Sequence, residues 1–334
     1  KNIGYLNFSG TLVGETSGGT RLSVVDSAGS EHTELASNKT GKTLLNPGKS
    51  PFSFEFCINI PEQANDNQII LQKVSGSAGD LSIAYGMTIA LSQSADASSC
   101  DLIFGITSGS QSLFTSSSLD KGKFNHVFVG YDRDKTQKLN IVKNLNLDTQ
   151  TFSQKSVEFK SLDFVGTNLQ IGSGSAMRLN DDPLLFEPKQ TFSGSMDELR
   201  YFRSFRKYDD LKEYRHKNLD FNKTDKDANL VLYYKFNEPF GTHAGNSLVL
   251  DSSGNSFNTN ILNFSTNNRL TSSIDIPLLK EDINRSPVLF PEFESIVTLN
   301  QKLMTTASLY DDFNPNLITK LVPGHYFDEG SLNL

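Results

Sequence analysis

Large apolar and polar residues alternate along much of the chain, and residues 52–60 give the clearest example. Every second position there is large and apolar, and the set comprises Phe52, Phe54, Phe56, Ile58 and Ile60. Successive side chains of a β-strand point to opposite faces of its sheet, so this pattern predicts a strand with one face on a core. The residues between them, Glu55 and Cys57 included, are predicted on the other face.

Similar runs follow at intervals of about a dozen residues, separated by Gly, Ser, Asn and Asp. A charged hairpin turn is expected at 132–135 and a short helix at 208–217. So many short strands predict a mostly β chain folded as an antiparallel β-sandwich. The other expected strands cover residues 68–74, 85–91, 101–107, 111–115, 124–131, 138–142, 169–172, 196–202 and 230–236.

The pattern changes after residue 264. The segment 265–290 begins with a polar stretch and is predicted to be a linker, which separates a sandwich over 1–264 from a tail over 291–334. In the tail, apolar residues recur at helical spacing, and Pro291 suits a first helical turn. We expect a short α-helical appendage whose apolar stripe needs a covering partner; the stripe comprises Ile296, Leu299, Leu303, Ala307 and Tyr310.

Charge and hydropathy narrow the range of partners. The net charge of −7 argues against nucleic acid, because phosphate binding needs clustered Lys and Arg. No apolar run approaches the roughly 20 residues of a membrane span, so no membrane insertion is expected. One basic cluster is interleaved with aromatic residues and is predicted to lie on a solvated strand edge; it comprises Arg200, Arg203, Arg206 and Lys207.

The chain has two cysteines, Cys57 and Cys100, which allow one disulfide at most. Both fall in or beside predicted strands, and we expect two free, buried thiols in preference to a bridge. Because the sequence opens on Lys1 and not on Met, we also expect it to be a fragment of a longer protein.

Five segments carry a family resemblance: SPFSFEF at 50–56, KFNHV at 123–127, LQIG at 169–172, FSGSMDELRYF at 192–202, and LYYKFNE at 232–238 with LDSSGN at 250–255. In this order they resemble the strands of laminin G-like, concanavalin A-like lectin domains over residues 1–264. Cys57 and Phe124 stand where that family usually has Trp, which this chain lacks entirely. The resemblance implies a jelly-roll sandwich and a module for binding or structure.

Asp197 is the candidate metal ligand of the chain. Strict alternation places it on the inward register with Leu199 and Tyr201, where a lone carboxylate is costly. The family resemblance implies a structural Ca²⁺ at this position, completed by backbone carbonyls. The alternative is that Asp197 caps backbone N–H groups or pairs with Arg200 or Arg203. No other cofactor is expected.

Catalytic chemistry finds little support in the sequence. Glycoside hydrolases of this architecture place paired carboxylates at a spacing such as E-x-D-x-x-E, which does not occur here. The acidic pair Asp181 and Asp182 precedes Pro183 and suits a loop, and the five histidines show no metal-ligand spacing. We therefore predict that the chain is not an enzyme. Sugar contacts remain open at Phe186, Phe240 and residues 255–260.

The segment DFNPNLITKLVP at 312–323 resembles parts of large virion structural proteins of tailed bacteriophages. That resemblance implies a tail- or baseplate-associated protein on the phage particle. Its helical tail would bind other virion proteins, and its sandwich would be displayed for protein or cell-surface contact, including host glycans. The alternative is an extracellular adhesin or carbohydrate-binding module.

Overall fold

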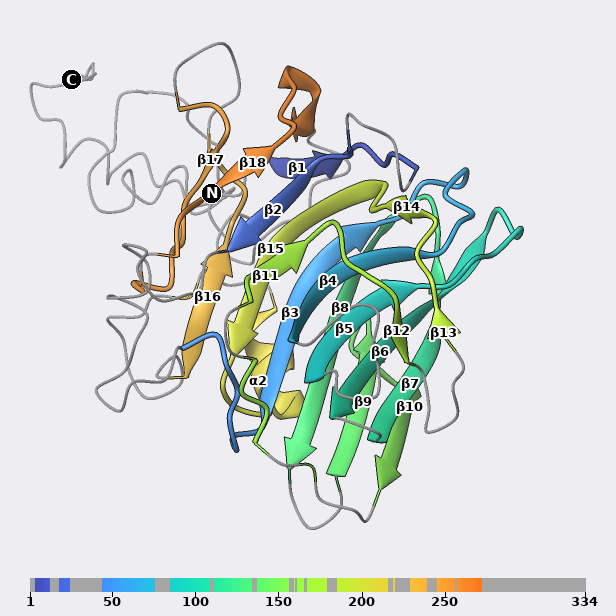
Figure 1. Ribbon diagram of the computed structural model, residues 1–334, viewed down its shortest axis with the longest axis vertical. Coiled ribbons are helices and arrows are strands. Elements are labelled where there is room, and N and C mark those ends of the chain that lie inside the picture. The colour runs from blue at the N-terminus through green and yellow to red at the C-terminus, as the bar shows by residue number, and fades with distance from the viewer. Residues whose placement is uncertain are drawn as a thin grey trace, which may run out of the picture. The chain divides into compact units, whose positions relative to one another are not determined.

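The computed structural model contains two β-sheets packed face to face (Figure 1). Their strands are antiparallel except for one short parallel pair, which confirms the predicted sandwich of the jelly-roll class. All described residues belong to one compact unit. The structure describes residues 4–12, 18–24, 44–75, 85–108, 111–133, 137–155, 159, 161–164, 167–178, 185–215, 219, 229–238, 245–255 and 257–271.

The first sheet has eight strands, and its middle is formed by β3 and β15. β16 pairs with β15 beside the main order. The order across the sheet is β10 (Asn146–Lys155), β9 (Gln137–Lys143), β8 (Phe124–Arg133), β3 (Phe52–Asn59), β15 (Gly194–Phe202), β1 (Tyr5–Phe8) and β19 (Arg269–Leu270), with β16 at Leu230–Tyr234.

The second sheet has nine strands, and the short β14 (Gln190–Thr191) runs parallel to β4. A separate two-stranded ribbon joins β12 (Met177–Arg178) to β13 (Leu185–Phe186). The main order is β17 (Leu248–Val249), β18 (Thr259–Leu262), β2 (Arg21–Val24), β11 (Leu169–Ile171), β4 (Gln68–Ser75), β5 (Tyr85–Leu91), β6 (Ser99–Ser108) and β7 (Gln111–Asp120).

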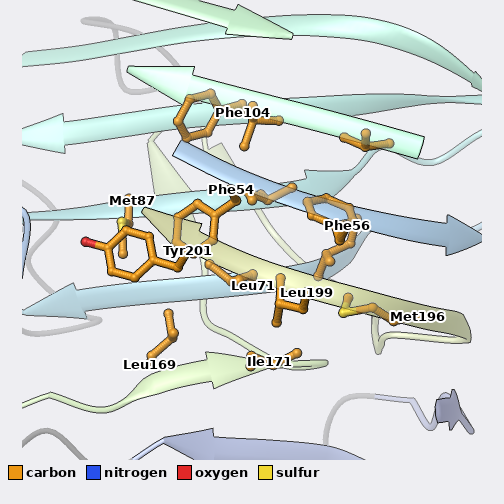
Figure 2. Close-up of a cluster of buried hydrophobic side chains, with 14 of the residues drawn as sticks. Phe54, Phe56, Leu71, Met87, Phe104, Leu169, Ile171, Met196, Leu199 and Tyr201 are labelled. Carbon is orange, nitrogen blue, oxygen red and sulfur yellow. The ribbon is translucent and has the colours of Figure 1, made fainter. Parts of the chain in front are cut away.

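The core lies between the two sheets, where side chains from both point toward one another (Figure 2). The inward residues of β3 are fully buried, as their alternation predicted. Phe54 stacks on Tyr201 of β15 with ring centroids 4.5 Å apart, and Phe52 meets Phe104 of the second sheet edge-on. Aromatic pairs of these geometries add to the free energy of simple burial.

The outward face of β3 is also buried, which the alternation did not predict. Glu55 is 2% exposed and Cys57 is 7% exposed. The chain after β15 forms an outer layer that includes α2 (Tyr208–Tyr214). Phe205 packs on Phe128 of β8, and Leu211 of α2 joins the same apolar cluster. The expected helix at 208–217 is therefore confirmed, and it covers part of the first sheet.

A β-bulge in β15 changes the predicted faces of that strand. Asp197 lies opposite Cys57 and Arg200 lies opposite Glu55, so two residues of β15 face Phe56 alone. Glu198 has a left-handed φ of 53°. Such a bulge inserts one residue and shifts the alternation. The inward register predicted for Asp197 is therefore wrong.

The sandwich continues past residue 264. The 3₁₀ turn Thr266–Asn268 and β19 both follow that position, and β19 pairs with β1. The Asn268 amide donates to Asn7 O at 2.8 Å and to Thr20 Oγ1 at 2.9 Å. The first residues of the predicted linker thus belong to the sandwich, while 272–290 and the predicted helical tail at 291–334 lie outside the described residues.

The predicted hairpin and the predicted state of the two cysteines are also found in the structure. β8 and β9 form the predicted hairpin, with β8 reaching Arg133 opposite Gln137. Cys57 and Cys100 are both free and buried, as expected. Within the described part of the chain, no helix has the length and apolar character that a bilayer crossing requires.

Replacing Phe54 by Ala should lower the free energy of unfolding by about 3–5 kcal/mol, because it removes a fully buried ring stacked on Tyr201. Phe152→Ala is the matched control: that ring is 55% exposed, and its loss should cost less than about 1 kcal/mol. Urea unfolding of both variants measures the difference. Equal destabilisation would contradict the assignment of Phe54 to the core.

Neither thiol of the native protein should react with a thiol reagent at pH 8. Burial raises the pKa of the Cys100 thiol to about 11, and burial beside Asp197 and Glu198 raises the pKa of the Cys57 thiol further. The thiolate is the reactive form. In guanidinium chloride both cysteines should react, and a colorimetric thiol titration counts them. Rapid native reaction of either would contradict its burial.

Candidate functional site

A buried ion-pair cluster lies on the outward face of the first sheet, formed by Glu55, Glu198, Arg200 and Arg206. Arg200 is 1% exposed and Arg206 is 4% exposed. The solvated strand edge predicted for the basic cluster is therefore wrong at these two positions. β15 is a central strand, and the outer layer covers its charged face.

Arg200 connects the members of this cluster. Its guanidinium is 2.7 Å from Glu198 Oε2 and 3.5 Å from Glu55 Oε1, and it donates to Tyr214 O at 3.0 Å. Arg206 Nε lies 3.4 Å from the other oxygen of Glu55. Removing one charged residue of this buried cluster would leave the charge of its partner uncompensated. The cluster is therefore a structural constraint on the fold.

Tyr233 of β16 completes the cluster. Its hydroxyl donates to Glu198 Oε2 at 2.6 Å, and the Arg200 guanidinium lies over its ring at 5.0 Å. Burial, together with the charge of Glu198, raises the pKa of Tyr233 well above its ordinary value. The hydroxyl therefore stays protonated and can donate. These carboxylates hold arginines in place and are not open to a substrate.

Asp197 is completely buried, and its Oδ1 accepts from the backbone N–H of Glu198 at 3.0 Å. The structure thus contains the backbone cap that was the alternative to metal binding. Among the described residues, no group of three or more His, Cys, Asp and Glu side chains could hold a metal ion. Calcium at Asp197 stays a prediction.

The Asp251 loop, residues 251–255, is a second set of conspicuous polar residues. Asp251 accepts from the backbone N–H groups of Tyr233 and Phe257, at 2.9 Å and 3.0 Å. Asn255 donates to Val231 O at 2.8 Å. Burial raises the pKa of the Asp251 carboxyl against the effect of these hydrogen bonds. The DSSGN motif therefore fastens this loop to β16.

The other residues considered in the sequence are buried, are engaged in hydrogen bonds, or lie outside the described part of the chain. Phe186 is 4% exposed and packs with Ile69 and Met177, so it is not the exposed sugar contact that the sequence left open. Most of the amide-rich stretch 255–260 is described, and Asn258 accepts from Asp251 N at 2.8 Å. His126 is buried on β8. Phe240 and the acidic pair Asp181 and Asp182 lie outside the described residues.

A hollow of about 250 Å³ opens beside the Asp251 loop. We call it the Arg203 hollow. Its lining mixes polar and apolar side chains from the loop before β3, the chain after β15, the start of β16, and the Asp251 loop. The lining residues are Leu44, Ser50, Arg203, Asn229, Leu230, Val231 and Asn255.

The walls of the Arg203 hollow are held by hydrogen bonds to the sandwich. The Tyr201 hydroxyl donates to Leu45 O at 3.2 Å, which fixes the loop before β3. The backbone N–H of Arg203 donates to Asn229 O at 2.9 Å, which joins the ends of β15 and β16. These hydrogen bonds hold two of the segments that line the hollow.

Several polar groups in the Arg203 hollow are available to a ligand. The guanidinium of Arg203 makes no hydrogen bond or ion pair with any described residue, and the Ser50 hydroxyl makes no hydrogen bond there either. Asn255 uses its Nδ2 on Leu230 O, Val231 O and Ser253 Oγ, which leaves its Oδ1 as a fixed acceptor. This set offers donors, an acceptor and an apolar wall.

The sequence pattern named Arg203 only as one member of a basic cluster and gave no sign of the hollow. Its lining residues come from positions 44–50, 203, 229–231 and 255, which no short motif connects. The one signal that could have singled out Arg203 was its position relative to the strand, which differs from that of Arg200. Arg200 lies within β15, whereas Arg203 follows the end of the strand.

No protein-family model matches the sequence, and comparison with curated proteins gives no match. Among solved structures, a Bacteroides ovatus protein described as a "putative carbohydrate binding protein" is 18% identical with a TM-score of 0.47. That alignment covers 82% of this chain and 62% of the other, so the chain spans about six tenths of that protein.

Two other structures overlap with smaller parts of the fold. Full-length tailspike protein 2 from an Escherichia coli O157:H7 bacteriophage is 13% identical with a TM-score of 0.38, over 70% of this chain and 30% of the tailspike. The CBM40 domain of the Ruminococcus gnavus IT-sialidase is 12% identical with a TM-score of 0.37, over 61% and 94%. Nothing about ligand or activity follows from likeness at this level.

Replacing Arg200 by Met should lower the free energy of unfolding by about 3–5 kcal/mol, because Glu198 would keep its charge in a buried site without its cation. Arg203→Met is the matched control, with an expected change within about 0.5 kcal/mol. Chemical denaturation compares the two. Adding Glu198→Gln to Arg200→Met should recover part of the loss, and no recovery would contradict the charge argument.

Proposed function

We propose that the sandwich is a non-catalytic recognition module that binds a glycan in the Arg203 hollow. The observation that carries the proposal is the lining of that hollow. Unengaged polar groups on Ser50, Arg203 and Asn255 stand beside the apolar side chains of Leu230 and Val231. Sugars present hydroxyls and apolar C–H faces together, so they suit a mixed lining of this kind.

The non-catalytic part of the proposal rests on how the carboxylates of Glu55, Glu198 and Asp251 are held. Glu55 and Glu198 are buried and ion-paired, and Asp251 accepts hydrogen bonds from its own loop and from β16. A glycosidic acid or nucleophile has to reach the substrate bond. No carboxylate is among the described residues that line the hollow.

The wider setting that we propose is the surface of a phage particle, with an extracellular adhesin as the alternative. This setting rests on the segment 312–323, which lies outside the described residues. Binding of the helical tail to other virion proteins is part of the same proposal. The full-length polypeptide and its neighbouring genes would distinguish the two settings.

The labelled chain should bind a subset of glycans on a glycan array. Ser50→Phe should abolish that binding, because a large ring would fill the hollow. Ser116→Phe is the matched control on an exposed position of β7 and should leave binding unchanged. Absence of any glycan signal from the folded chain would overturn the proposed function, and unchanged binding by the folded Ser50→Phe variant would place the site outside the hollow.

A further inference from the structure

Within the described part of the chain, Arg203 is the one charged residue that lines the hollow. Its backbone is fixed to Asn229 O at 2.9 Å, and its side chain is half-buried without a carboxylate partner among the described residues. The contrast with its neighbours is informative, since Arg200 and Arg206 are both engaged by glutamates. A cation left unengaged in a hollow is a site for an anion.

The guanidinium group favours one kind of anion. Its planar fork donates two parallel hydrogen bonds to a carboxylate, and such charge-assisted pairs are about twice as strong as neutral hydrogen bonds. Partial burial strengthens the pair further, because water screens it less than on an open surface. An anionic group bound here would therefore contribute much of the affinity.

The other lining groups favour a sugar over an acidic peptide. Asn255 Oδ1 is an acceptor held in place by three hydrogen bonds from its own amide nitrogen, and it would accept from a hydroxyl. Ser50 and Asn229 add further polar groups, and Leu44 and Val231 add an apolar wall. A volume of about 250 Å³ suits one ring, since sites for drug-sized ligands begin near 300 Å³.

We propose that the Arg203 hollow binds the carboxylate of an acidic sugar residue, such as a uronic or sialic acid, within a larger glycan. The inference rests on the proposed glycan-binding function and names its ligand class. Arg203 engages the carboxylate, Asn255 Oδ1 accepts from a ring hydroxyl, and the side chains of Leu230 and Val231 contact the C–H face.

The test titrates the full chain with glucuronate, galacturonate and N-acetylneuraminate, and with neutral glucose and galactose, by ligand-observed NMR. At least one acidic sugar should bind about tenfold or more tightly than the neutral sugars, and Arg203→Ala should remove that preference. Arg203→Lys keeps the charge without the fork and should restore only part of it. Lys123→Ala removes one exposed positive charge elsewhere and should leave the preference intact.

Several results would overturn the inference. Equal binding of acidic and neutral sugars, or an unchanged preference in Arg203→Ala, would show that the hollow does not select for a carboxylate. Equal binding of acetate would show that no sugar is recognised, and tighter binding of a glutamate-rich peptide would favour a peptide ligand. If glycan-array binding persists while Arg203→Ala has no effect, the proposed function survives and only the acidic-sugar assignment fails.

Discussion

The pairing of β15 with β3 is the interaction on which the rest of the structure depends. β15 pairs with β3, β1 and β16, so it joins both halves of the first sheet. Its inward residues Met196, Leu199 and Tyr201 belong to the main core. Its outward residues are charged and buried, and buried charges are tolerated only when they are paired. One strand therefore has to satisfy two different constraints.

The β-bulge at Glu198 reconciles these constraints. The inserted residue lets Met196 and Leu199 both reach the core, although an unbroken strand would place them on opposite faces. It also brings Glu198 within 2.7 Å of Arg200 on the outward face. The outer layer can then close over the cluster, because Arg200 binds the carbonyl of Tyr214 at the end of α2.

The Arg203 hollow follows from the same arrangement. Where β15 ends, the chain turns into the outer layer, and Arg203 stands beyond the last residue of the strand, Phe202. Its backbone joins the start of β16, whose position is fixed by the Asp251 loop. The motifs that mark the family resemblance, around Asp197 and Asp251, thus position the hollow and do not line it, apart from Asn255.

The alternation of residues 52–60, the hairpin at 132–135 and the short helix after β15 could all be predicted, because each depends on neighbours in the sequence. The faces of β15 could not, because a bulge depends on what the opposite strand and the outer layer require. The burial of Arg200 and Arg206 depended likewise on partners far away in the chain, such as Glu55.

The sequence by itself determined the class of fold and most of its strands, through the period of the apolar residues and the turn residues between them. Only the tertiary structure decided which arginine is engaged and which is available, and it assembled the hollow from four separate segments. The physical reason is that periodicity records which face of a strand is apolar. The pairing of a charge depends on the three-dimensional positions of groups that the chain brings together from far apart.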